Sequence, residues 1–270
     1  MKKVILVTGA SSGLGLATAN ALSAQGHTVY GTSRDIKRIK KDVSFTPLQM
    51  DVTDDASVNA GIDKIIKAEG RIDVVVNNAG NGIAAPLYAV PVDDAKKQFE
   101  VNFFGVVRVN SAVLPGMIEK KQGLVINIGS LAGLFGLPYQ GLYSASKFAI
   151  EGYSQSLRME LQNTGIKVSV INPGDFKTDF TGSREKIPFT LPNEQLKKEF
   201  EAAVASMEKD ESIGGDPGKV AAQVCKIVAK SKPAHNYLVG ALGQTIVPTL
   251  KAILPGSIFV KLMNDHYGIK

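Results

Sequence analysis

The sequence predicts a doubly wound parallel α/β sheet of about seven strands, with helices on both of its faces. Short runs rich in Val, Ile and Leu alternate with longer segments whose apolar residues recur at helical spacing. The first run, Val4–Val7, is apolar throughout, which is typical of a strand buried on both faces. No Pro/Ser-rich linker divides the 270 residues, so we expect one domain over residues 1–270.

Composition and charge exclude several other classes of protein. The single cysteine, Cys225, cannot form an internal disulfide, which suits a cytoplasmic location. The net charge of +6 is spread along the chain, so we expect an anionic small ligand and no nucleic acid. His27, His235 and His266 lack metal-ligand spacing, and no window of continuous apolar residues predicts a membrane-spanning helix.

A glycine-rich turn follows the first strand and precedes a segment of helix-forming residues. Strand, glycine turn and helix are the context of a dinucleotide-phosphate site, because glycines admit the backbone close to the phosphates and a helix N-terminus offers free N–H groups. An ordinary turn is the alternative. The turn residues expected to hold phosphate are Gly9, Ser11, Ser12, Gly13, Leu14 and Gly15.

The end of the second predicted strand, over residues 28–32, bears on the choice of cofactor. A carboxylate at this place binds a ribose diol, whereas an arginine accommodates a 2′-phosphate. Ser33 leaves space and Arg34 supplies charge, although the spacing of Asp35 leaves a ribose contact open. We therefore expect NADP(H), with NAD(H) as the alternative.

Further strands are predicted over residues 45–50, 72–76, 124–128, 167–171 and 236–240. A helix over about 92–117 carries the amide of Asn102 within an apolar stripe. A buried amide needs partners, so Asn102 either satisfies backbone groups or holds a water near the active site.

Tyr143 and Lys147 lie one turn apart on a predicted helix, so they share one face. A lysine charge beside a phenol favours the phenolate and makes the tyrosine a usable acid or base nearer neutral pH. This works only in a partly buried cleft, preferably with a second cation, and an isolated pair is usually an exposed helical pair. Ser130, at the end of the preceding strand, is predicted to converge with Tyr143 at one sheet edge.

The alternation of strands and helices breaks after Thr178. Residues 181–215 form either a lid over the substrate or a surface excursion, with an amphipathic helix carrying Leu196, Phe200, Val204 and Met207. The tail, residues 241–270, is apolar in pieces. It is expected to cover a substrate pocket, contact another subunit or, less favourably, touch a membrane surface.

Together these motifs resemble the short-chain dehydrogenase/reductase family, in its compact branch, over most of residues 4–178. The stretch from Val29 to Asp35 is also similar to NADP-preferring members related to 17β-hydroxysteroid and retinol dehydrogenases. The matching residues are Thr8, Gly9, Gly13, Gly15, Asp51, Asn77, Asn78, Ala79, Gly80, Asn102, Ser130, Tyr143, Lys147, Pro173, Gly174 and Thr178.

The resemblance implies a role for each catalytic position. Tyr143 would be the general acid/base and Ser130 would bind the substrate oxygen. Lys147 would lower the pKa of Tyr143 and bind the nicotinamide ribose, while Asn102 would anchor a water relay. The implied cofactor contacts beyond the glycine turn are Ser33, Arg34, Asp51, Val52, Asn78, Ala79, Gly80, Tyr143, Lys147, Pro173, Gly174 and Thr178.

The function expected from this resemblance is NADP(H)-dependent hydride transfer between nicotinamide and an alcohol or carbonyl group. The relatives suggest a lipophilic steroid- or retinoid-like substrate, and a homodimer or homotetramer formed through helices around 92–117 and 140–163. A nucleotide-binding sensor or scaffold without turnover is the alternative from another class.

Overall fold

The computed structural model describes residues 1–187, 189–191 and 193–269. Its centre is a seven-stranded parallel sheet with the strand order β3-β2-β1-β4-β6-β7-β9, as the alternation of patterns predicts. The strands are β1 (Val4–Val7), β2 (Thr28–Ser33), β3 (Thr46–Gln49), β4 (Val74–Asn77), β6 (Gly123–Ile128), β7 (Ile166–Pro173) and β9 (Asn236–Val239).

The order of the strands fixes where a ligand can bind. The chain runs outward from β1 through β2 to β3 and then returns to pair β4 with the other side of β1. In open α/β sheets, ligands bind outside the carboxyl ends of the strands at such a reversal. The turns after β1 and β4 therefore border the expected cofactor crevice.

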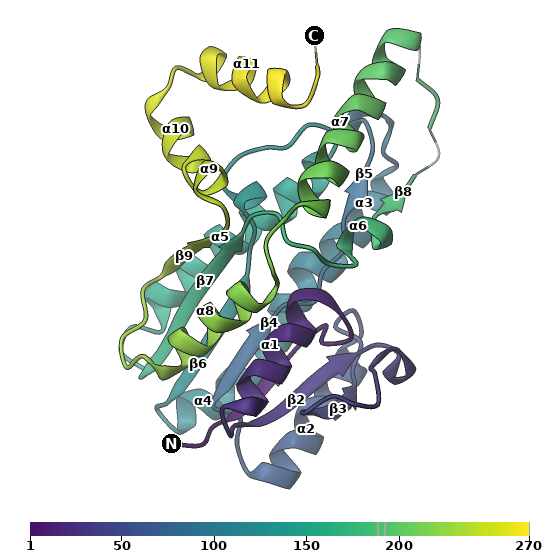
Figure 1. The fold of residues 1–270 in the computed structure, drawn as a ribbon. Coiled ribbons are helices and arrows are strands. Elements are labelled where there is room, and N and C mark those ends of the chain that lie inside the picture. Colours follow the sequence, from purple (N-terminus) through teal and green to yellow (C-terminus); the bar gives the residue numbers. More distant parts are fainter. Residues whose placement is uncertain (188, 192, 270) are drawn as a thin grey trace.

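Helices cover both faces of the sheet. Figure 1 shows α1 (Gly13–Ala24) and α8 (Gly218–Ala229) lying side by side on one face, where they pack against each other. The opposite face carries α2 (Asp55–Glu69), α4 (Gly105–Glu119) and α5 (Gly141–Glu160).

Because helices cover both faces of the sheet, every residue of β1 is apolar. Val4 and Leu6 belong to the core beneath α2, α4 and α5, whereas Ile5 and Val7 belong to the core beneath α1 and α8. Alternate side chains of a strand point to opposite faces, so both sets are buried. Burying each such side chain stabilises the fold by about 1.5–3 kcal/mol.

The helix expected over about 92–117 runs from α3 (Val92–Phe99) through a π-helical segment (Glu100–Phe104) into α4. Its length and mean hydropathy of 1.3 would suffice to span a membrane, although the sequence suggested no such helix. Core helices pass the same test, and 39% of its apolar window is buried inside this fold. Here it packs against α2 and α5.

Two segments stand above the carboxyl edge of the sheet (Figure 1). The 181–215 segment contributes α7 (Glu194–Ser212), which buries Val204 and Met207 as predicted, and the unpredicted strand β8 (Glu185–Lys186), which pairs with β5 (Ile83–Ala84). Residues 188 and 192 of this segment, and residue 270 of the tail, lie outside the described residues. The remaining short elements are η1 (Ile36–Arg38), η2 (Leu87–Ala89), η4 (Leu131–Gly133) and α6 (Phe180–Ser183).

The tail forms α9 (Leu242–Thr245), α10 (Val247–Ile253) and α11 (Gly256–His266), which arch from the end of β9 toward α7 (Figure 1). The last turn of α11 is fixed to α7. The His266 ring lies 2.9 Å from Oδ2 of Asp210, and the Ser206 hydroxyl donates to the His266 carbonyl at 3.3 Å.

Candidate active site

Three predicted catalytic residues converge at the carboxyl edge of β6. Ser130 follows this strand directly, and Tyr143 lies in the first turn of α5 with Lys147 one turn later. Nζ of Lys147 lies 5.7 Å from the centre of the Tyr143 ring and donates to the Ile128 carbonyl at 2.8 Å. Strand, turn and helix start thus place the phenol, the hydroxyl and the ammonium together.

Ser130 is held on its backbone side by a buried amide. Its N–H donates to Oδ1 of Asn172 at 2.8 Å, and its hydroxyl accepts from the Ala132 N–H at 3.1 Å. Asn172 is fixed in turn because its amide donates to Glu151 and to Asn236. These bonds fix the backbone of Ser130 near Tyr143, but sequence spacing could not reveal them, since they join distant parts of the chain.

The expected lowering of the tyrosine pKa does not occur in this state. Burial raises the pKa of Tyr143 to about 12; the Ser130 hydroxyl and Arg184 lower it, and the charges of Glu211 and Asp175 raise it further. Burial also lowers the pKa of Lys147 to about 8. Lys147 therefore keeps its positive charge at neutral pH but loses it as the pH rises through about 8.

Asn102 is fully engaged within the protein. It lies in the π-helical segment and is 1% exposed. Its Oδ1 accepts from the Asn81 N–H at 2.9 Å, and its Nδ2 donates to the Asn81 carbonyl at 3.0 Å and to the Ser146 hydroxyl at 3.1 Å. The side chain thus satisfies backbone groups, the first of the two expected roles. It also joins the turn after β4 to the Tyr143 helix.

The glycine turn fits a dinucleotide phosphate. Gly9 has φ +67°, and a Cβ there would lie 2.8 Å from Cα of Ala79. A Cβ on Gly15 would lie 2.2 Å from the Gly9 carbonyl oxygen, so only glycine permits this close turn. The Ser12 hydroxyl makes no capping bond to a described residue at the start of α1. The helix N–H groups at Gly13 to Gly15 are thus open to an anion.

The segment after β4, which contains Asn78 and Ala79, contacts the glycine turn directly. The Asn78 amide donates to the carbonyls of Thr8 and Gly9 at 2.9 and 3.1 Å, while the Thr8 hydroxyl accepts from the N–H groups of Asn78 and Ala79. The Asn78 side chain thus shapes the phosphate turn. Gly80 is exposed beside it and remains placed for the predicted cofactor contact.

The adenosine end is bordered by β2 and β3. Ser33 is 7% exposed at the end of β2, and Arg34 follows it with an exposed side chain. The carboxylate of Asp35 accepts from the Lys37 N–H at 3.0 Å and caps η1, which turns it toward its own backbone. Arg34 is therefore the better placed of the two for a ligand.

Asp51 and Val52 lie after β3, where the sequence predicts the adenine contact. Oδ1 of Asp51 accepts from the N–H and the hydroxyl of Thr53 at 3.0 and 2.8 Å. Val52 is 7% exposed and packs against Gly105 of α4. Asp51 and Val52 therefore stabilise the loop after β3, and both lie at the carboxyl edge of the sheet, as predicted.

The nicotinamide end is framed by the segment after β7. Pro173 is the last residue of that strand, and the Gly174 N–H donates to the Val239 carbonyl at 2.9 Å. A Cβ on Gly13 would lie 3.2 Å from Cβ of Thr178, so this segment reaches the phosphate turn. Pro173, Gly174 and Thr178 thus span the distance between the tyrosine and the phosphate site.

Several residues of the site escaped the sequence analysis. The Phe180 ring lies 5.4 Å from the Tyr143 ring, and Cζ of Arg184 lies 5.9 Å from the Phe180 ring. Arg184 forms an ion pair with Glu211 of α7 and has a side chain only 1% exposed. Phe180 and the 181–215 segment that follows it therefore bring an aromatic ring and a buried ion pair to the tyrosine, a feature that composition alone could not show.

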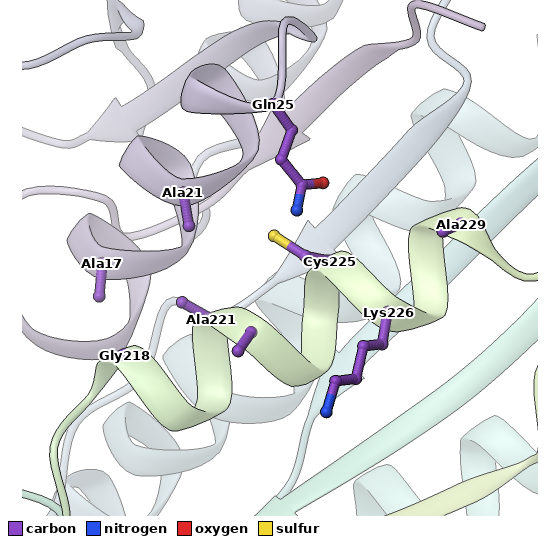
Figure 2. Close-up of a pocket in the computed structure, with 9 residues that line it drawn as sticks. Ala17, Ala21, Gln25, Gly218, Ala221, Cys225, Lys226 and Ala229 are labelled. Carbon is purple, nitrogen blue, oxygen red and sulfur yellow. The ribbon is translucent and has the colours of Figure 1, made fainter.

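A separate groove of about 490 Å³ lies between α1 and α8 (Figure 2). It is lined mainly by alanines, and the Cys225 thiol borders it. Burial raises the pKa of Cys225, which keeps the thiol protonated and agrees with a packing role. Among the described residues no cluster of His, Cys, Asp and Glu could hold a metal ion.

Comparisons with known proteins agree with this geometry. The short chain dehydrogenase family model matches residues 3–187. The chain is 43% identical over 268 residues to "3-ketodihydrosphingosine reductase" of Bacteroides thetaiotaomicron, covering 99% of both chains. It is 33% identical to human 17-beta-hydroxysteroid dehydrogenase type 1, covering 97% of this chain and 85% of that one.

A solved structure described as the closed form of serine dehydrogenase complexed with NADP⁺ matches with a TM-score of 0.76 and 27% identity. The match covers 89% of this chain and 95% of the other. A nicotinamide cofactor supplies or accepts the hydride in such a site. The chain therefore belongs to the short-chain dehydrogenase family and is an oxidoreductase of alcohol and carbonyl groups that uses a nicotinamide cofactor.

Proposed function

We propose that the protein reduces a long-chain 2-amino ketone of the 3-ketodihydrosphingosine type to the corresponding alcohol, with NADPH as the reductant. The observation that carries this proposal is the match over nearly the full chain to a relative named 3-ketodihydrosphingosine reductase, together with the convergence of Tyr143, Ser130 and Lys147. The Tyr143 phenol is buried, which raises its pKa to about 12. Such a phenol keeps its proton at neutral pH. Reduction needs that protonated form, whereas oxidation needs the phenolate.

The reaction adds a hydride to the carbonyl carbon and a proton to the carbonyl oxygen. In our proposal the Ser130 hydroxyl donates a hydrogen bond to the oxygen and Tyr143 gives it the proton. Lys147 binds the ribose and, while it is charged, stabilises the phenolate that remains. The tyrosine then recovers its proton from solvent.

Two features support a lipophilic substrate with an amino group. The relative named for a ketosphingoid base matches the chain over nearly its full length. The tail helices beside the site expose large apolar side chains, among them Leu242 at 83% and Ile253 at 69%. A steroid or retinoid is the alternative, because relatives named retinol dehydrogenase 8 and 17-beta-hydroxysteroid dehydrogenase type 1 match most of the chain.

NADP(H) is proposed as the cofactor because of the end of β2. Arg34 is exposed where a 2′-phosphate would lie, and Asp35 is occupied as the cap of η1. Asp35 caps η1 through Oδ1, and its exposed carboxylate is the group that the alternative cofactor, NAD(H), would use.

The test measures NADPH oxidation with 3-ketodihydrosphingosine, steroid ketones and retinal as substrates. Tyr143→Phe removes the proton donor, and we expect it to lower kcat/KM by about 10²–10⁴-fold. Tyr153→Phe is the matched control on the same helix, since the Tyr153 hydroxyl accepts from the Asn110 amide at 3.3 Å and has no bond to a proposed catalytic residue in the described part of the chain. It should change the rate by less than about threefold.

A sensor or scaffold gives a different result. It would bind NADPH, as followed by quenching of nucleotide fluorescence, without turnover on any member of the panel. Equal turnover by the Tyr143→Phe variant would contradict the assignment of the acid.

A further inference from the structure

Asp175 is a part-buried carboxylate in the wall formed by the end of β7 and the tail, close enough for its charge to raise the pKa of Tyr143. It follows Gly174 at the end of β7, and its backbone is held on two sides. Its N–H donates to Oε1 of Gln244 at 3.2 Å, and its carbonyl accepts from the Gly215 N–H at 2.9 Å. Oδ2 accepts from the Gln244 amide at 2.5 Å, so the side chain has a fixed direction.

The surroundings of Asp175 are unfavourable for a bare negative charge. Burial, Asp210 and Glu211 raise the pKa of Asp175 to about 6, while His266 and Arg184 lower it. The same region acts on the catalytic tyrosine, since Glu211 and Asp175 both raise the pKa of Tyr143. Negative charge here opposes formation of the phenolate on which proton transfer depends.

A second observation that indicates a ligand beside Tyr143 is a buried nitrogen of Arg184 without a hydrogen-bond partner among the described residues. Its guanidinium bonds to Glu211 through Nη2, and the amide oxygen of Gln140, in its better orientation, lies 3.2 Å from Nε and Nη2. Its Nη1 is buried and has no hydrogen-bond partner among the described residues. A buried donor left open in this way calls for an oxygen acceptor.

These observations together describe a wall that suits a cationic substrate with a nearby oxygen. A cation at Asp175 would compensate the buried carboxylate and would also favour the phenolate of Tyr143. An uncharged ketone would provide neither effect.

We propose that Asp175 selects the substrate by pairing with an ammonium group on the carbon next to the reacting carbonyl, while Nη1 of Arg184 donates to a neighbouring substrate oxygen. This inference rests on the proposed reduction of a 2-amino ketone and names the residues that recognise its polar head. Asp175 is then a specificity residue, and Tyr143 and Ser130 act on the carbonyl itself.

The experiment compares two substrates in NADPH-dependent reduction near pH 7. One is 3-ketodihydrosphingosine, and the other is the analogue in which hydrogen replaces the amine. Asp175→Asn keeps the shape of the side chain and its reach to Gln244 but removes the charge. We expect the selectivity, the ratio of kcat/KM for the amino ketone to that for the analogue, to fall by about 10- to 100-fold. Asp175→Glu should retain part of it.

Asp179→Asn is the matched control, because it removes an exposed carboxylate from the same segment. Its selectivity should equal that of the wild type. An unchanged selectivity in Asp175→Asn, or a wild type that prefers the uncharged analogue, overturns the inference while the reductase assignment stands. If the wild type binds NADPH but reduces neither ketone, the proposed function itself fails, and the inference fails with it.

Discussion

Arg34→Ala tests the choice of cofactor at the end of β2. The guanidinium is exposed, and it follows the 7% exposed Ser33 that leaves space at the strand end. Removing the charge should weaken the use of NADPH and leave the use of NADH almost unchanged, because only NADPH carries the 2′-phosphate.

The size of the effect follows from the exposure of Arg34. A phosphate monoester carries about 1.5 to 2 negative charges near neutral pH, and each contributes about 1 kcal/mol at about 4 Å in water. The contact is therefore worth about 2 kcal/mol at low salt, and screening at physiological ionic strength reduces it. We expect the preference for NADPH over NADH to fall by about 10- to 30-fold. Adding Ser33→Asp places a less exposed carboxylate there and should lower the preference further.

The assay measures kcat/KM for both cofactors at a fixed carbonyl concentration and at two salt concentrations. Asp35→Asn is the informative comparison. Because Asp35 caps η1 through the Lys37 N–H, this change should cost at most about 1 kcal/mol of local stability and leave the cofactor ratio unchanged. A ratio that is insensitive to Arg34→Ala, or a selective loss of NADH use in Asp35→Asn, would refute the reasoning.

Two further predictions concern charge and stability. The pKa of Lys147 is lowered to about 8, so its ammonium is present below that pH and lost above it. The maximal rate of ketone reduction should therefore fall as the pH rises through about 8. Tyr143, with its pKa raised to about 12, stays protonated over this range. Asn77→Ala removes an amide that donates to the buried oxygens of Asn110 and Asn127 at 2.9 and 2.8 Å, and urea unfolding should show a loss of about 2–5 kcal/mol. Asn59→Ala on the exposed side of α2 should change stability by less than about 0.5 kcal/mol, and a similar loss there would contradict the network.

The sheet was predictable because its signals are local. Several strands, among them β1, β4 and β6, are short runs rich in Val, Ile and Leu, and the alternation with helices leaves few topologies open. Two differences from the prediction are confined to short stretches of the chain. β7 continues to Pro173, whereas the predicted strand ended at residue 171, and a π-helical segment interrupts the long helix at Glu100. Neither changes the strand order, since both lie at the ends or within the span of a predicted element.

The substrate side of the site depended on contacts that no local pattern encodes. Arg184 meets Glu211 across the 181–215 segment, and Asp175 meets Gln244 of the tail. Each partner alone is an ordinary polar side chain of a loop or helix. Only the folded chain brings them to Tyr143, so the motifs predicted the chemistry while the residues that select a substrate stayed hidden.

The pKa of Tyr143 depends on the relative size of two opposing effects, burial and the charge of Lys147. Burial and nearby carboxylates raise this pKa from 10.0 to about 12, a change of about 3 kcal/mol. A full charge on Lys147, 5.7 Å from the ring, would supply about 3 kcal/mol in the opposite direction at an effective dielectric near 20. The two effects are of equal size while Lys147 is charged, and because burial lowers the pKa of Lys147 to about 8, this charge is lost as the pH rises through that value. The balance is therefore set by the cations that complete the site, and a substrate ammonium at Asp175 is one that the protein can select.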